Sequence, residues 1–192
     1  MKFDLHVKKN NKEKEEFYED MLPTRDIALD LLRKLRVSFN VKRHSLKVAE
    51  KALEIANKIK KVKINKKLVE IGALLHDIGR AKTHGFKHAL IGGKILRERG
   101  FPKSLARICE THILGGLDKE DAKEVGLPER DYIPQTIEEK IVCLADKMTA
   151  GTREVSIRKR FENWFRKYGR SKLLLKSKKR VEKIKKEIED LM

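Results

Sequence analysis

A histidine and an aspartate, His76 and Asp77, stand side by side after two leucines in the sequence Leu-Leu-His-Asp-Ile-Gly-Arg. The leucines carry this segment into a core, where an imidazole and a carboxylate are costly unless a partner satisfies them. A divalent cation is such a partner, because neutral imidazole and ionised carboxylate are among its preferred ligands. The pair therefore predicts a metal site.

Further candidate ligands surround this pair in the sequence. Five of the six histidines lie between residues 44 and 112, beside apolar helical sequence, and Asp146 follows another apolar run. One buried histidine is usually a hydrogen-bonded core residue, whereas several in one short region favour a metal site over a metal-free polar network. The candidate metal ligands are His44, His76, Asp77, His88, His112 and Asp146.

Apolar residues recur with helical spacing almost throughout the chain from Thr24 onward, and no strand ladder is visible. Thr24 and Asn65 are candidate N-caps, and Thr136 with Glu139 forms a candidate capping box. The spacing predicts an all-α fold. The expected helices cover about 24–36, 42–60, 65–78, 87–99, 102–112, 118–125 and 136–148, with two more after 153 that are separated near Gly169.

The candidate ligands fall near the ends of these expected helices. His44 lies in a first turn, His76 and Asp77 in a last turn, and Asp146 near the end of its helix. Side chains at helix ends can converge at the mouth of a bundle, where a metal and its substrate remain accessible. We therefore expect one shared cavity.

The order His44, His76-Asp77, Asp146, with Ile-Gly after the pair, resembles the HD superfamily of metal-dependent phosphohydrolases in its HDIG form. The resemblance covers roughly residues 24–152 and is greatest to a small archaeal subgroup of HDIG proteins. It implies an HD-domain-like helical bundle in which these four side chains bind the shared metal.

The resemblance also implies roles for two later histidines. His88 and His112 match the extra histidines of members with two metals, and Asp77 would bridge the two ions. Ile113 follows His112 where some of those members have a second adjacent histidine, so one ion or two remains open. Arg80 stands where they have a lysine, which keeps a cation for phosphate but changes its geometry.

The ligand types indicate the chemistry. Mixed histidine and carboxylate sites suit Mn²⁺, Fe²⁺, Co²⁺, Ni²⁺ or Zn²⁺ rather than Mg²⁺. Such an ion lowers the pKa of bound water toward about 7, which gives a hydroxide that can attack phosphorus. Asp77 is the candidate to orient or deprotonate this water, and Arg80 and Lys82 are candidate phosphate contacts.

The chain divides into three expected segments. Residues 1–22 form a charged, loosely ordered leader, in which the alternation Phe3, Leu5, Val7 could form a short strand. Residues 23–152 form the metal-binding domain, and 153–192 form a basic amphipathic helical extension. The irregular stretch 113–135 is expected to lie over the pocket, where Tyr132 would either stack on a base or anchor the loop.

The net charge of +18 favours an anionic partner such as a nucleotide or nucleic acid, although a lysine-rich proteome would explain it equally well. Residues 153–192 hold fifteen Lys or Arg against six Asp or Glu. They could form an RNA-binding arm, with Trp164 or Tyr168 stacking on bases. Docking of the apolar stripe on the domain is favoured. The candidate RNA-phosphate contacts are Lys176, Lys178, Lys179 and Arg180.

The composition also indicates the cellular compartment of the protein. The chain has no apolar run of membrane-spanning length, and its first residues lack the apolar core of a signal peptide. Cys109 and Cys143 form no Cys-x-x-Cys pair and are expected to be buried, reduced thiols. These features predict a cytoplasmic protein.

The leading hypothesis is a divalent-metal-dependent phosphohydrolase, a phosphomono- or phosphodiesterase, acting on a nucleotide, dinucleotide or RNA-end phosphoester. The alternative is a basic nucleic-acid-binding protein in which the metal site is structural or vestigial. An oxygenase of the HD type would need two irons, and Ile113 after His112 disfavours it.

Overall fold

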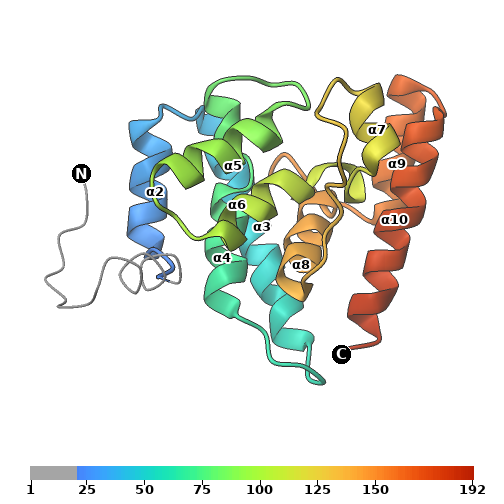
Figure 1. Ribbon diagram of the computed structural model, residues 1–192. Coiled ribbons are helices and arrows are strands. Elements are labelled where there is room, and N and C mark those ends of the chain that lie inside the picture. The colour runs from blue at the N-terminus through green and yellow to red at the C-terminus, as the bar shows by residue number, and fades with distance from the viewer. Residues whose placement is uncertain (1–20) are drawn as a thin grey trace, which may run out of the picture.

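The computed structural model describes residues 21–192, so the predicted leader strand lies outside the described residues. The predicted all-α fold is confirmed (Figure 1). Two 3₁₀ turns, η1 (Ile78–Ala81) and η2 (Ile113–Gly115), follow α4 and α6. The α-helices are α2 (Arg25–Lys34), α3 (Phe39–Lys58), α4 (Lys66–Leu75), α5 (His88–Glu98), α6 (Lys103–Thr111), α7 (Lys119–Glu124), α8 (Ile137–Lys147), α9 (Ile157–Tyr168) and α10 (Lys172–Glu189).

The predicted helix caps are present where a polar side chain precedes an apolar helix. Thr24 and Asn65 accept hydrogen bonds from the backbone N–H three residues on, at the starts of α2 and α4. Thr136 caps α8 by accepting from the Glu139 N–H. Only half of the predicted capping box forms, because the Glu139 carboxylate accepts from Gln135 N–H and Arg107.

A two-residue β-hairpin, which the sequence did not predict, follows α8. Strand β1 (Thr149–Ala150) pairs antiparallel with β2 (Arg153–Glu154), and Gly151 turns between them with a φ of 61°. Such a φ favours glycine. The turn places the Gly151 carbonyl against the His44 ring, so the hairpin contributes to the site described below.

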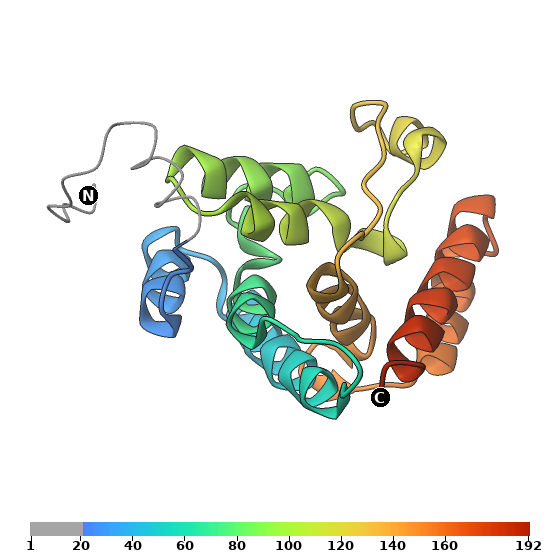
Figure 2. The same cartoon turned by 60° about the horizontal axis from the view of Figure 1, so that its bottom comes forward.

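One main hydrophobic cluster holds the helices together. Helix α3 packs against α4 and α8, α5 packs against α6 and η1, and α10 packs against α8 and η2. Figures 1 and 2 show α2 at one end of the molecule and the α9–α10 hairpin at the other. The candidate ligands lie among the central helices α3, α4, α5, α6 and α8.

The basic C-terminal segment docks on the domain, as its apolar stripe favoured. Val181, Ile184 and Ile188 of α10 belong to the main core cluster. Gly115 lets α10 approach closely, because a Cβ there would lie 2.8 Å from the Val181 side chain.

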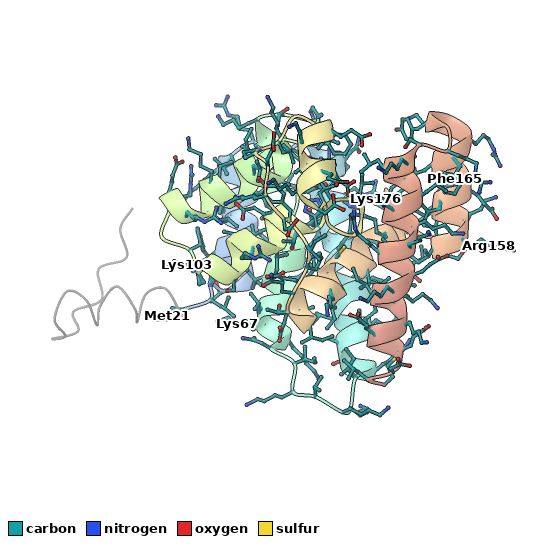
Figure 3. The ribbon with its side chains drawn as sticks, turned by 45° about the vertical axis from the view of Figure 1, so that its right-hand side comes forward. Met21, Lys67, Lys103, Arg158, Phe165 and Lys176 are labelled. Carbon is teal, nitrogen blue, oxygen red and sulfur yellow. The ribbon has the colours of Figure 1, made fainter. Side chains whose placement is uncertain are left out.

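The basic side chains of α10 reinforce this docking. Lys176 lies 2.6 Å from Asp118 and 2.7 Å from Asp121, and Arg180 pairs with the same two carboxylates. Figure 3 shows Lys176 on the side of α10 that faces α7. Two of the four candidate phosphate contacts of the extension are therefore used in this docking, and a third, Lys178, pairs with Glu182 within α10.

The expectation that residues 113–135 cover the pocket is wrong for most of that stretch. Only Ile113 and Leu114 of it line the cavity. Tyr132 is 1% exposed, its hydroxyl donates to the Pro128 carbonyl, and its backbone pairs with Leu117. Tyr132 therefore anchors the loop, because its ring completes a second apolar cluster with residues of α7 and α10.

Within residues 21–192, none of the helices has the length and apolar character needed to span a lipid bilayer.

Candidate metal centre

The six candidate ligands come from five helices or their immediate ends. His44 lies in the second turn of α3, His76 is the C-cap of α4 and Asp77 follows it. The remaining three are His88 at the first position of α5, His112 at the C-cap of α6, and Asp146 one residue before the end of α8. The structure therefore brings the helix ends together as the sequence predicted.

Each of the four imidazoles is oriented by a backbone carbonyl. The Nδ1 atom lies 2.7–2.8 Å from the carbonyl oxygen of Gly151 for His44, Ala73 for His76, Gly85 for His88 and Cys109 for His112. A carbonyl oxygen only accepts, so Nδ1 must carry the proton in every ring. This fixes the tautomer and leaves each Nε2 with a free lone pair, as is typical of metal-binding histidines.

The free Nε2 atoms converge on the two carboxylates. The distance from His44 Nε2 to Asp146 Oδ1 is 2.9 Å, and His76 Nε2 lies 3.7 Å from both Asp77 Oδ2 and Asp146 Oδ1. On the other side of Asp77, its Oδ1 lies 3.0 Å from His88 Nε2 and 3.5 Å from His112 Nε2.

Buried polar atoms in this cluster lack partners. His76 is fully buried and Asp77 is 4% exposed, yet His76 Nε2 and Asp77 Oδ1 have no hydrogen bond. An unpaired buried polar atom is strongly unfavourable, and acceptors that face one another add repulsion. A cation among these atoms would satisfy them, so the donor set fits a metal.

The ligand atoms form overlapping groups of metal-binding size. Within the described residues, three groups have ligand atoms within 4.8 Å of one another. They are His44–His76–Asp77, His76–His112–Asp146 and Asp77–His88–His112. His76, Asp77 and His112 each occur in two groups, which makes them the centre of the cluster. Nitrogen and carboxylate oxygen together suit a divalent transition metal better than Mg²⁺.

The electrostatics favour the ligating protonation states of His76, His112, Asp77 and Asp146. Burial lowers the pKa of His76, and lowers that of His112 to about 4, so both rings are neutral at neutral pH. Burial opposes ionisation of Asp77 and Asp146, but the surrounding histidines, and Lys147 beside Asp146, hold both carboxyl pKa values well below the usual range. The pKa of His44 is raised, because the Asp146 carboxylate outweighs the effect of burial.

Two cations adjoin the cluster. Arg80 lines the cavity, and its Nε donates to Asp77 Oδ2 at 2.7 Å. Lys147 is buried and bonds to both Asp146 and the His112 carbonyl. The predicted phosphate contact Lys82 is exposed and does not line the cavity, because the tight η1 turn directs Arg80, not Lys82, toward Asp77.

Five of the six candidate ligands, all but His76, line a cavity of about 790 Å³, a size typical of small-molecule sites. Its other wall comes from α9 and the start of α10, through residues that the sequence placed on a possible RNA arm. They are Arg160, Trp164, Tyr168, Ser171, Leu173 and Leu174. The sequence does carry one indication of this wall, because the aromatic residues at 161, 164, 165 and 168 repeat at helical spacing and so share one face of a helix.

Comparison with known proteins agrees with this geometry. The model of the HD domain family matches residues 41–151, which include all six candidate ligands. The chain belongs to the HD domain family. The α9–α10 hairpin lies outside the matched residues.

Three archaeal proteins are similar to parts of this HD chain. An uncharacterized protein of Methanocaldococcus jannaschii is 56% identical over 84 residues, which is 44% of this chain and 50% of that protein. Two tRNA (cytidine(56)-2′-O)-methyltransferases, from Picrophilus torridus and Thermoplasma volcanium, are 41% and 42% identical over 92 and 95 residues. These alignments cover 48% and 50% of this chain but only 27% and 28% of the methyltransferases.

A solved HD domain has a similar fold. The HD domain of the Listeria monocytogenes phosphodiesterase PgpH, in complex with cyclic-di-AMP, matches with a TM-score of 0.50 and 21% identity. The match covers 82% of this chain and 97% of that domain.

Proposed function

We propose that this HD protein is a metal-dependent phosphohydrolase that acts on the phosphoester of a nucleotide or dinucleotide. The observation that carries the proposal is the set of four imidazoles that commit Nδ1 to backbone carbonyls and present Nε2 to Asp77 and Asp146. Such preorganisation is the mark of a metal site rather than of a polar core.

The ligand set has room for two ions. His44, His76, Asp77 and Asp146 would hold one, and Asp77, His88 and His112 would hold a second. When bound, divalent cations in such sites act as Lewis acids toward phosphoryl oxygens and acidify a bound water. The donor types favour Mn²⁺, Fe²⁺, Co²⁺, Ni²⁺ or Zn²⁺.

The protein's own residues would orient the reaction around Asp77. Its Oδ2 accepts from Arg80 and its Oδ1 is without a hydrogen bond, so the carboxylate is fixed at one oxygen and available at the other. Oδ1 faces His88 and His112 and would bind the second ion, so Asp77 would orient an attacking water as a metal ligand. The Arg80 guanidinium, at the cavity wall, would offset charge on a phosphate.

The test is a phosphoesterase assay with Mn²⁺, Co²⁺ or Ni²⁺ on nucleoside monophosphates, dinucleoside polyphosphates, and cyclic mono- and dinucleotides. His76→Ala and Asp77→Ala should abolish turnover while the far-UV helical signal persists. Asp26→Ala, an exposed aspartate in the first turn of α2, is the matched control and should retain activity. Metal-loaded protein that cleaves none of these esters would refute the proposal.

An RNA-binding protein with a structural metal site is a second candidate, supported by the similarity to part of two tRNA methyltransferases. The basic C-terminal arm is a weaker argument for RNA, because Lys176 and Arg180 pair with Asp118 and Asp121. RNA binding driven by surface phosphates would fall steeply with salt. Tight tRNA binding without metal-dependent turnover would favour this alternative, in which the metal site is structural.

A further inference from the structure

The wall of the cavity that faces solvent beyond the ligand set is supplied by the α9–α10 hairpin. Trp164 and Tyr168 of α9 line the same cavity as His44, Asp77 and Asp146. The match to the HD family ends at residue 151, before this hairpin begins. A substrate held at the ligand set therefore lies within reach of aromatic residues that the matched HD region does not supply.

Trp164 is held in place by buried neighbours. Its ring packs edge-on against the fully buried Phe161, with centroids 5.1 Å apart and an interplanar angle of 84°. The Arg160 guanidinium lies 5.3 Å from the Trp164 centroid. A ring fixed in this way is a preorganised surface rather than a mobile side chain.

Arg160 links this aromatic residue to the candidate metal centre. Its guanidinium donates to the carbonyl oxygens of Asp146 at 3.0 Å, Lys147 at 2.8 Å, and Thr149. These carbonyls belong to the C-terminal end of α8, which carries Asp146, and to β1. The position of the Trp164 ring is thus set relative to a candidate ligand through two contacts.

Two further aromatic side chains of the cavity lining are exposed. Tyr168 is 61% exposed and Phe86 is 39% exposed, and both line the cavity together with Trp164. Leu173 and Leu174 add apolar surface to the same lining. Exposed aromatic rings beside apolar side chains can stack on the flat ring of a ligand. The candidate metal ligands and Arg80, in the same cavity, complement an anionic group of that ligand.

We propose that Trp164 and Tyr168, with Phe86, form a base-stacking wall, which recognises the nucleobase of a nucleoside phosphate whose phosphate lies at the histidine and aspartate cluster. The inference rests on the proposed phosphohydrolase function and assigns its specificity. A cavity of about 790 Å³ suits a mono- or dinucleotide, so phosphoesters that carry a base are preferred over base-less sugar phosphates.

Binding can be tested without turnover, because Trp164 is the only tryptophan of the chain. The His76→Ala variant, checked for its helical signal, is titrated with AMP, GMP, CMP and UMP, with the four nucleosides and with ribose 5-phosphate. Nucleotides and nucleosides should change Trp164 emission saturably, whereas ribose 5-phosphate should not. If no base-containing ligand changes the emission, or ribose 5-phosphate changes it equally, the stacking wall is refuted even where phosphohydrolase activity is present.

Kinetics of the unmodified protein and its variants supply the second readout. Tyr168→Ala and Phe86→Ala should each lower kcat/KM for the preferred nucleotide about tenfold, mainly through KM, and leave ribose 5-phosphate hydrolysis unchanged. Tyr168→Phe should restore the wild-type value, because the ring and not the hydroxyl stacks. Phe39→Ala is the matched control, since Phe39 is 69% exposed and does not line the cavity.

The two proposals fail in different ways. Equal losses on nucleotide and sugar phosphate in Tyr168→Ala would overturn the stacking wall and leave the phosphohydrolase standing. Absence of turnover on all esters would overturn the phosphohydrolase, while the emission titration would still decide whether a base binds beside Trp164.

Discussion

His88 Nε2 and His112 Nε2 lie 3.2 Å apart, although each ring donates its Nδ1–H to a backbone carbonyl and so leaves Nε2 unprotonated. Two unprotonated nitrogens at this distance repel one another, and Asp77 Oδ1 lies 3.0 Å from the first and 3.5 Å from the second. A cation turns this repulsion into coordination. On the other side of the cluster, His44 Nε2 lies 2.9 Å from Asp146 Oδ1, and there the carboxylate raises the pKa of His44.

Metal removal should therefore destabilise the protein. A ligand present at 100 times its Kd adds about 2.7 kcal/mol to the free energy of unfolding. For a chain of this length, that corresponds to a rise in Tm of about 5–10 °C. Thermal melts with Mn²⁺ or Zn²⁺ and after chelation measure the difference. A melting temperature that is the same in metal and in chelator would contradict a metal in this cluster.

The number of ions follows from the two ligand groups that share Asp77. Wild-type protein should bind two ions, and His88→Ala should bind one, because His88 belongs only to the group with Asp77 and His112. Elemental analysis of equilibrated protein gives the stoichiometry. His84→Ala is the matched control and should still bind two, since His84 belongs to none of the ligand groups found in residues 21–192. One ion in wild type would leave only the group around His44 and His76.

Local sequence signals predicted most of the helices but not the cover of the cavity. Thr24, Asn65 and Thr136 mark helix starts because capping depends on residues three apart in the chain. His76 and Asp77 were identified as candidate ligands because polar groups directly after an apolar run are expected to be buried and therefore to need a partner. Both kinds of signal depend only on residues that lie within a few positions of one another in the sequence.

The features that the sequence did not predict depend on packing between segments that are far apart in the chain. Nothing near Tyr132 distinguishes an anchor buried in the second apolar cluster from a ring over the pocket. The position of Trp164 over the cavity depends on Arg160 reaching carbonyls in α8 and β1, 11 to 14 residues earlier in the chain. The close pairing of Gly115 with Val181 likewise joins distant segments.

Docking of α10 should weaken in acid through Asp118. Partial burial opposes ionisation, but the hydrogen bond from Lys176 and the charge of Arg180 lower the pKa of Asp118 to about 2 from an ordinary 3.8. A pKa that is depressed on folding adds stability above the ordinary value, and that stability is lost as pH falls from about 4 toward 2.

The substitution Asp118→Asn isolates this charge, because asparagine also caps helices well and Asp118 is the N-cap of α7. Urea unfolding should show Asp118→Asn less stable than wild type at pH 6, with the difference shrinking by pH 3. Asp26→Asn, in the first turn of α2, serves as the control for a general loss of negative charge. A difference that stays constant with pH would argue against an ionic contribution of Asp118 to docking.

Gly79 sets the distance between Asp77 and α5, and its replacement should damage both stability and metal binding. A Cβ at Gly79 would lie 1.9 Å from the His88 carbonyl oxygen and 2.6 Å from the Gly92 nitrogen, so the backbone of α5 would have to move. Overpacking of this kind typically costs about 1–3 kcal/mol, and contact with backbone atoms places Gly79→Ala at the upper end. The displaced helix would carry His88 away from Asp77 Oδ1, which in the wild-type structure lies 3.0 Å from His88 Nε2.

Gly79→Ala should thus lower the midpoint of urea unfolding and reduce the number of bound ions from two to one. Gly85→Ala is the stability control, because a Cβ there meets nothing within 4 Å. Equal midpoints for the two variants would show that α5 tolerates the added methyl group and that Gly79 does not position His88.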